Sequence, residues 1–139
     1  MAAILIDASA LIALLDRGDR NQKACVIALE SLTDPLMTVW PAVTEAMHLL
    51  AETPAAQEAL FDMLTDDAVG LANLDDADLK RMKVLMQKYR DLPMDFADAA
   101  LVRVAERERL SRILTFDKHF RVYALPGRAR FVVIPQSKR

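Results

Sequence analysis

The sequence predicts a three-layer α/β/α sandwich with a short, mostly parallel central sheet. Short apolar runs of strand length alternate along the chain with amphipathic patterns of helix length. The first of these runs is apolar at every position, as expected for a strand that is buried on both faces of a sheet. A length of 139 residues matches one compact domain, and we therefore expect a single domain over residues 1–139.

The first strand is expected at Ala3–Ile6, an unbroken apolar run that ends at Asp7. A helix over Ser9–Leu15 follows directly. A polar break then separates it from a second helix over Asn21–Leu32, for which Asp19 is a candidate N-cap.

The second strand is expected at Leu36–Trp40. Proline is tolerated in the first turn of a helix, so Pro41 and Pro54 each mark a helix start. The two helices are expected to reach about Ala51 and Leu64, and a third strand follows at Ala68–Leu71.

Three aspartates open the next helix, which extends to about Tyr89. They are Asp75, Asp76 and Asp78. Its apolar residues at core spacing are Leu79, Met82, Leu85 and Met86. Its opposite side is basic, and we interpret that side as a solvated face.

The last elements follow a break at Asp91-Leu92-Pro93. A helix over Asp95–Glu108 is expected, with an apolar stripe that includes Leu101. A strand at Ser111–Phe116 and a final strand at Arg130–Ile134 complete the sheet, with a loop between them.

Composition limits the possible functions. The hydrophobic fraction of 53% is high, which favours an apolar surface that meets a partner. The net charge of -2 provides no global basic field, so nucleic acid would need local basic groups or a bound metal ion. The single cysteine, Cys25, excludes an internal disulfide and a thiolate metal site.

Nothing in the sequence indicates a membrane protein. The longest uncharged stretches, such as Pro35–Thr44, are much shorter than the roughly 20 apolar residues of a membrane helix. The apolar N-terminus lacks the basic region of a signal peptide, and Asp7 interrupts it. We therefore expect a cytoplasmic protein.

Acidic residues gather where the carboxyl edge of the sheet is expected. Asp7 and Asp117 each follow an apolar strand, and Glu45 lies one turn into the helix after the second strand. Asp95 and Asp98 begin the helix before the strand of Asp117. Ligands of parallel sheets collect at this edge. The three aspartates near residue 76 share the edge by the same logic, because one sequence does not determine strand order.

Clustered carboxylates indicate a divalent cation. Like charges at close range raise one another's pKa, so such a cluster is stable mainly when a cation neutralises it. Ligands that are all oxygen favour Mg²⁺ or Mn²⁺ over zinc. These ions promote in-line hydrolysis of phosphodiesters, which makes a phosphate ester the expected substrate.

Four segments together resemble the PIN-domain ribonucleases. They are Ile4-Leu-Ile-Asp7-Ala-Ser9-Ala-Leu, the segment around Glu45, Asp98-Ala-Ala-Leu-Val, and Leu114-Thr-Phe-Asp117-Lys-His-Phe. Their order and spacing fit the family over nearly the whole chain. At this length, the chain is most similar to the VapC-type toxins of bacterial toxin–antitoxin pairs.

The resemblance implies specific roles and partners. Asp7, Glu45, Asp98 and Asp117 would be the catalytic residues and the ligands of Mg²⁺ or Mn²⁺. RNA would be the substrate, a small cognate antitoxin the inhibitor, and a homodimer the functional form. Beside these four, Asp95, Ser9 and Thr115 are candidate auxiliary residues, and Lys118, His119 and Arg121 are candidate RNA contacts.

Structural explanations compete with several of these roles. Asp7 could cap the first helix, Asp95 and Asp98 could form a capping pair, and Glu45 could be a solvated helix residue. His48 forms a Glu-x-x-His pair with Glu45, but a di-iron bundle needs two such pairs, so we interpret His48 as structural.

Two other functions remain open. One is a magnesium-binding signalling module that resembles response-regulator receivers, although no phospho-accepting aspartate follows the third strand. The other is a catalytically inactive PIN-like module that binds RNA or protein.

Overall fold

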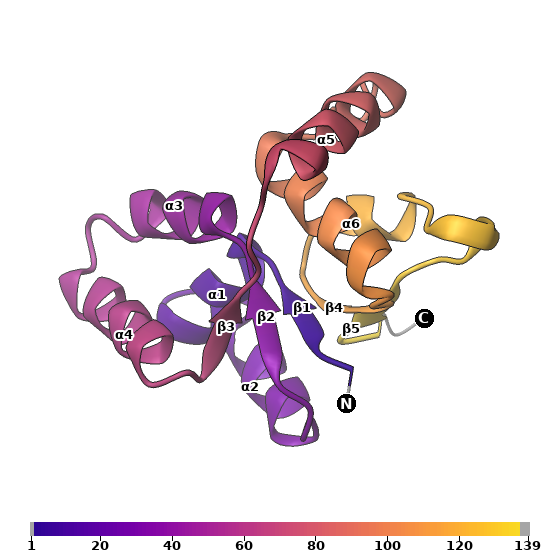
Figure 1. Ribbon diagram of the computed structural model, residues 1–139. Coiled ribbons are helices and arrows are strands. Elements are labelled where there is room, and N and C mark those ends of the chain that lie inside the picture. Colours follow the sequence, from indigo (N-terminus) through magenta and orange to yellow (C-terminus); the bar gives the residue numbers. More distant parts are fainter. Residues whose placement is uncertain (1, 137–139) are drawn as a thin grey trace.

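The computed structural model describes residues 2–136. Five strands form one sheet in which every neighbouring pair is parallel, and the strand order is β3-β2-β1-β4-β5 (Figure 1). The strands are β1 (Ile4–Ile6), β2 (Leu36–Thr38), β3 (Val69–Leu71), β4 (Arg112–Leu114) and β5 (Val132–Ile134). The predicted parallel sheet is therefore confirmed.

Six α-helices connect and cover these strands. They are α1 (Ala8–Leu15), α2 (Gln22–Glu30), α3 (Trp40–Leu49), α4 (Pro54–Thr65), α5 (Asp76–Lys88) and α6 (Phe96–Glu108). Two short 3-10 turns, η1 (Lys118–Arg121) and η2 (Pro126–Arg128), lie in the segment that we expected to be a loop. The predicted strands and helices are all present, and their ends differ from the expected ones by a few residues.

The alternation of side chains along β1 divides the core in two. Ile4 and Ile6 pack with α1, Cys25 and residues of α4 on one face of the sheet. Leu5 packs with α5, α6 and the aromatic residues of the segment after β4 on the other face. Because all three strand residues are fully buried, β1 has the continuous apolar pattern of a central parallel strand. The three-layer architecture follows from this division.

The strand order places a crevice between β1 and β4. After β1 the chain adds β2 and β3 on one side, and it then returns to add β4 and β5 on the other side. Such a reversal leaves an open crevice at the carboxyl ends of the strands. Response-regulator receivers have the order 2-1-3-4-5 instead, so the fold argues against the receiver alternative.

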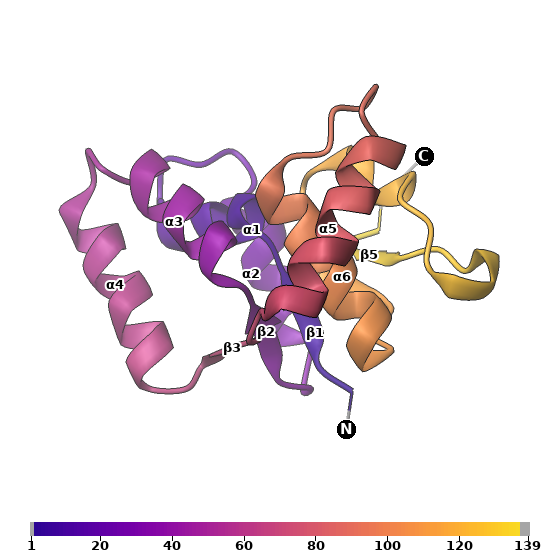
Figure 2. The same ribbon diagram turned by 45° about the horizontal axis from the view of Figure 1, so that its top comes forward.

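Helices α3 and α6 lie at the two sides of this crevice. Helix α3 contributes Ala42 to one half of the core and Val43 and Ala46 to the other half. It therefore lies across the end of the sheet. Figure 2, which turns the top of Figure 1 forward, shows α3 and α6 on opposite sides of β1.

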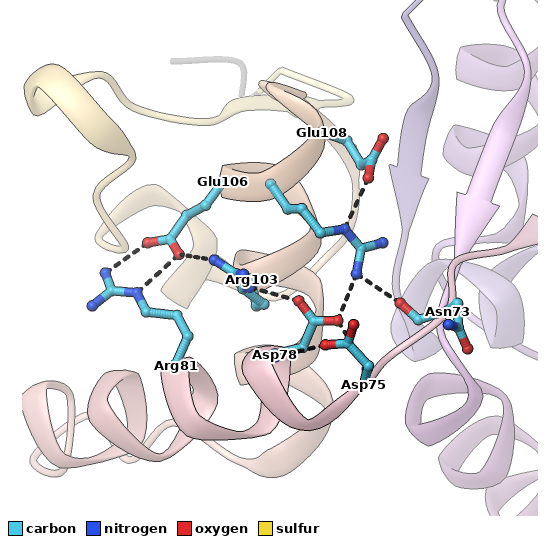
Figure 3. A network of polar contacts seen from close by, with 8 residues as sticks. Asn73, Asp75, Asp78, Arg81, Arg103, Glu106 and Glu108 are labelled. Carbon is cyan, nitrogen blue, oxygen red and sulfur yellow. Dashed lines mark hydrogen bonds and ion pairs between the residues drawn. The ribbon is translucent and has the colours of Figure 1, made fainter.

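An ion-pair network fastens α5 to α6 (Figure 3). Asp78 is only 1% exposed, and its carboxylate accepts hydrogen bonds of 2.7 Å from both Arg103 and Arg107. It also accepts a 2.9 Å bond from the backbone N–H of Asp75, which completes a capping box at the start of α5. Asp78 thus has a structural role away from the acidic pocket described below.

The exposed side of α5 includes one residue that we expected in the core. Met82 and Leu85 are buried as predicted, but Leu79 is 45% exposed. The helix packs mainly against α6, and the narrow contact between two helices leaves residue 79 at its margin. Within residues 2–136, no helix is long and apolar enough to cross a membrane.

Candidate active site

Asp7 is buried at the carboxyl end of β1, and three polar groups of the protein hold its carboxylate. Its Oδ1 accepts bonds from the Ser9 hydroxyl at 2.7 Å and from the Ala10 N–H at 3.1 Å, and its Oδ2 accepts a bond from the Thr115 hydroxyl. Burial raises the pKa of Asp7 to about 6, despite these hydrogen bonds, and the charge of Asp117 adds to the rise. The carboxylate is therefore both oriented and costly to ionise without a cation.

Two hydroxyl groups connect Asp7 to the end of β4. Ser9 Oγ accepts a 2.9 Å bond from the backbone N–H of Phe116, and Thr115 Oγ1 accepts one of the same length from Asp117 N–H. The hydroxyls therefore fix the distance between the two strand ends that carry acidic residues. This supports the auxiliary role expected for Ser9 and Thr115.

Asp98 lies in the first turn of α6, where Asp95 is the N-cap. The Asp95 carboxylate accepts a 2.8 Å bond from the Asp98 N–H, and Oδ2 of Asp98 accepts a 3.0 Å bond from the Tyr123 hydroxyl. Burial raises the pKa of Asp98 well above its usual range, and the charges of Asp95 and Asp117 raise it further. The Tyr123 hydroxyl therefore holds the Asp98 carboxylate in place, and the charges of Asp95 and Asp117 oppose its ionisation.

Glu45 and Asp117 complete the acidic set from two other elements. Glu45 lies on α3, and partial burial raises its pKa, with further contributions from the charges of Asp95 and Asp117. Asp117 precedes η1 and caps it by accepting a 2.9 Å bond from the His119 N–H. The charges of Asp95 and Asp117 therefore act on the carboxylate of Glu45, although the three residues belong to separate elements.

One small cavity brings the predicted residues together. It has a volume of about 50 Å³ and lies at the crevice between β1 and β4. Its polar lining residues are Asp7, Ser9, Glu45, Asp95, Asp98 and Asp117. All four predicted catalytic carboxylates therefore share this space, which we call the acidic pocket.

The donor chemistry of the acidic pocket fits a hard divalent cation. Its side-chain donors are carboxylates and one serine hydroxyl, with no imidazole or thiol group. Within residues 2–136, no three carboxylate, imidazole or thiol groups are already close enough to hold one ion directly. Mg²⁺ usually keeps several of its waters and takes only one or two protein carboxylates, so the pocket suits it without a preformed cage. The raised pKa values are consistent with carboxylates that a cation would neutralise.

The candidate RNA-contact residues lie on the other side of Asp117. Lys118 and Arg121 line an adjacent hollow of about 270 Å³, which Asp117 and Thr115 also line. His119 Nδ1 lies 3.3 Å from Oδ1 of Asp117. These positions are beside the acidic pocket but outside it, and RNA contact by these residues stays a prediction.

Some of the candidate residues have structural roles in the fold. Asp7 does cap α1, and Asp95 caps α6, although both residues also line the acidic pocket. Asp75, Asp76 and Asp78 do not line the acidic pocket, because β3 is at the edge of the sheet. His48 is exposed on α3 and does not fill the core, and its role stays a prediction.

Tyr123 is the residue of the site that the sequence did not indicate. It lies in the segment read as a loop, yet it is fully buried and reaches Asp98. The spacing of Phe120 and Tyr123, three residues apart, was the available signal, because one helical turn places such residues on the same side.

The chain is similar in sequence to proteins of a known family. The PIN domain family model matches residues 4–125. The chain is 35% identical over 136 residues to Ribonuclease VapC26 of Mycobacterium tuberculosis, and the alignment covers 95% of this chain and 100% of that relative.

Two solved structures have a similar fold. One is the crystal structure of Mycobacterium tuberculosis VapC20, a sarcin-ricin loop cleaving toxin (TM-score 0.77, 18% identity, 84% of this chain and 91% of that chain). The other is a toxin–antitoxin complex from Klebsiella pneumoniae (TM-score 0.65, 20% identity, 84% of this chain and 88% of that chain).

Proposed function

The chain belongs to the PIN domain family, and we propose that it is a magnesium- or manganese-dependent endoribonuclease that acts as the toxin of a toxin–antitoxin pair. The observation that carries this proposal is the acidic pocket, in which Asp7, Glu45, Asp98 and Asp117 converge from four separate elements. Identity of 35% with a ribonuclease over nearly the whole chain supports RNA as the substrate.

Asp7, Asp98 and Asp117 would hold the cation either directly or through its bound waters, with Glu45 at the margin of the pocket. When bound, Mg²⁺ or Mn²⁺ would neutralise these carboxylates and make the scissile phosphate more susceptible to attack by water. The protein's own contribution is to hold the carboxylates in place before substrate arrives. Ser9 and Thr115 orient Asp7, and Tyr123 orients Asp98.

Glu45 is the candidate acceptor for a proton of the attacking water. Its side chain is largely exposed beside the pocket, and partial burial together with the charges of Asp95 and Asp117 raises its pKa. A carboxylate with a raised pKa accepts a proton more readily near neutral pH. The Oε atoms of Glu45 can therefore take the proton while the buried Asp7 and Asp98 hold the site together.

Basic residues and partners complete the proposal. Lys118, His119 and Arg121 lie within the four residues after Asp117 and would contact RNA phosphates. A small antitoxin would inhibit the enzyme, in keeping with the toxin–antitoxin complex among the similar structures. Exposed apolar residues on several helices support a homodimer.

The decisive experiment is cleavage of structured RNA by the purified protein with Mn²⁺. We expect endonucleolytic cleavage that EDTA abolishes and that Asp7→Asn and Asp98→Asn each reduce by at least about 100-fold. Asp76→Asn is the matched control, because Asp76 is an exposed aspartate at the start of α5, outside the acidic pocket. Activity that survives full chelation, or that Asp7→Asn leaves unchanged, would contradict the proposal. A protein that binds RNA but never cleaves it would be the inactive PIN-like module.

A further inference from the structure

A wide groove opens beside the acidic pocket, between the starts of α3 and α6. It has a volume of about 610 Å³. Its walls include Trp40, Thr44 and His48 from α3 and Phe96 from α6. Trp40 is 59% exposed and Phe96 is 50% exposed. We call this feature the aromatic groove.

The aromatic groove is continuous with the acidic pocket. Glu45, Asp95 and Ala97 line both cavities. A ligand whose phosphate occupies the acidic pocket would therefore have its neighbouring groups at the entrance of the groove. This continuity connects the groove to the substrate of the proposed nuclease.

The chemistry of the groove matches an unpaired nucleobase. Aromatic side chains stack on bases of single-stranded nucleic acid, since every base has a π-face. Thr44 Oγ1 donates a 3.0 Å bond to the backbone carbonyl of Trp40, which leaves the oxygen able to accept a bond from a base edge. His48 adds a second polar group to the same wall.

Basic residues lie beyond the aromatic groove, where they could bind the phosphate backbone of an RNA strand. Phe96 also lines a second groove of about 490 Å³, whose walls include Lys83 and Arg90. Both basic residues are exposed on α5 or just after it. A chain with a net charge of -2 needs such local cations to attract a phosphate backbone to an acidic site.

A second copy of this chain fits the aromatic groove less well. Glu45 and Asp95 line it, so a second copy seated in this groove would bury both carboxylates. Burial of unpaired carboxylates opposes association. A nucleotide stacked on the aromatic rings would instead leave the carboxylates of Glu45 and Asp95 in contact with water.

We propose that Trp40 and Phe96 form a stacking subsite for an unpaired base next to the scissile phosphate, and that Lys83 and Arg90 hold the RNA backbone beyond it. This inference rests on the proposed ribonuclease function. It assigns a binding role to residues outside the acidic set.

The test uses Trp40 as its own reporter, because it is the single tryptophan of the chain. A short single-stranded RNA is titrated into the Asp98→Asn variant with Mg²⁺, and tryptophan fluorescence is recorded. We expect quenching by the single strand and little quenching by the same strand annealed to its complement. An abasic nucleotide at the stacked position should also abolish quenching.

Matched variants test the subsite by affinity. In the same background, Phe96→Leu and Trp40→Leu should each weaken binding of the single strand by about 5- to 100-fold. Phe61→Leu should not, since Phe61 is 61% exposed on α4 and does not line the groove. Lys83→Gln and Arg90→Gln should weaken binding and reduce its salt dependence.

The outcomes separate this inference from the proposed function. If wild-type protein cleaves RNA while Trp40 fluorescence is unchanged and Phe96→Leu behaves like Phe61→Leu, the stacking subsite is wrong and the nuclease stands. If Trp40→Leu and Phe96→Leu convert a dimer to a monomer in sedimentation without weakening RNA binding, the groove is a subunit interface and the inference is overturned. Absence of cleavage by the wild type contradicts the proposed function itself.

Discussion

The hydroxyl of Tyr123 donates a hydrogen bond to Oδ2 of Asp98 across 3.0 Å, which joins the segment after β4 to the first turn of α6. The Tyr123 ring packs edge-on against Tyr89 and Phe120, with centroids 5.0 and 5.2 Å apart. Burial and the charge of Asp98 raise the pKa of Tyr123, so its hydroxyl stays protonated and remains a donor. The aromatic core therefore positions a carboxylate of the acidic pocket.

Tyr123→Phe should weaken metal binding with little loss of stability. The ring packing is kept, but Asp98 loses its donor, and loss of such a supporting hydrogen bond typically reduces metal affinity by about 10-fold. Calorimetric titration with Mn²⁺ measures this effect directly. Tyr89→Phe is the control, because the Tyr89 hydroxyl accepts a bond from Ala124 N–H and not from a pocket residue. Equal Mn²⁺ affinity in Tyr123→Phe and wild type would show that Tyr123 only fills the core.

The metal-free protein should lose stability as pH rises from about 4 to 7. The pKa values of Asp7 and Asp98 are raised in the folded state, so the folded protein retains protons that the unfolded chain releases in this window. Fewer protons on the unfolded chain mean that stability falls with increasing pH. Asp98→Asn removes one of these ionisations and should melt higher than wild type in EDTA near pH 7, by roughly 3 to 8 °C. Its amide oxygen can still accept the Tyr123 bond.

Two variants control this measurement. Asp76→Asn should leave the pH dependence unchanged, since Asp76 is exposed and outside the acidic pocket. Asp95→Ala should lower stability by about 1 kcal/mol through loss of the α6 cap, with or without metal. An Asp98→Asn variant that melts lower than wild type at every pH, and that keeps the full stabilisation by Mn²⁺, would remove Asp98 from the metal site.

Asp78→Asn should destabilise the fold and leave the active site intact. Asp78 pairs with Arg103 and Arg107 in a buried position, and loss of one partner of a buried pair costs about 3 to 5 kcal/mol. Urea unfolding measures the loss. Arg81→Gln is the control at the exposed end of the network and should cost at most about 1 kcal/mol. Mn²⁺ affinity should be unchanged in both variants.

The effect of Asp78 should also depend on acidity in the opposite sense to Asp98. Burial opposes its ionisation, but hydrogen bonds from Asp75 and Arg103 and the charges of Arg107 and Arg103 lower its pKa to about 2. The wild type therefore keeps this stabilisation above about pH 4 and loses it as the pH falls towards 2. The difference between wild type and Asp78→Asn should shrink over that range. A constant difference would mean that packing, and not charge, accounts for the loss.

Inhibition by the antitoxin should depend on charge in the acidic pocket. We expect the antitoxin to lay an apolar helix in a groove of the enzyme and to direct a basic side chain to the acidic pocket. In the complex with its cognate partner, we expect Asp98→Asn to weaken binding by about 10-fold and to reduce its salt dependence, with Asp76→Asn unchanged. Expressed alone, the wild type should arrest growth of its host and sediment as a dimer. A monodisperse monomer at tens of micromolar that is harmless when expressed alone would contradict the toxin and dimer assignments.

Local sequence was sufficient for the elements, and the family resemblance indicated the members of the acidic set. The apolar run before Asp7, the prolines at the starts of α3 and α4 and the stripe of α6 each predict one element through short-range preferences. The carboxyl-edge argument left eight acidic residues as candidates, and the family resemblance then selected Asp7, Glu45, Asp98 and Asp117, which share the acidic pocket. The elements depend on residues close together in the chain, which is why they could be derived without the fold.

Tertiary structure alone decided which acidic residues meet. Strand order results from packing between distant segments, and only that order places β4 beside β1 and moves β3, with Asp75 and Asp78, to the edge. The same long-range packing brings Tyr123 to Asp98, leaves Leu79 exposed and joins the aromatic groove to the acidic pocket. Hydrophobic burial is non-directional, so a pattern of apolar residues indicates that a face is covered but not which segment covers it.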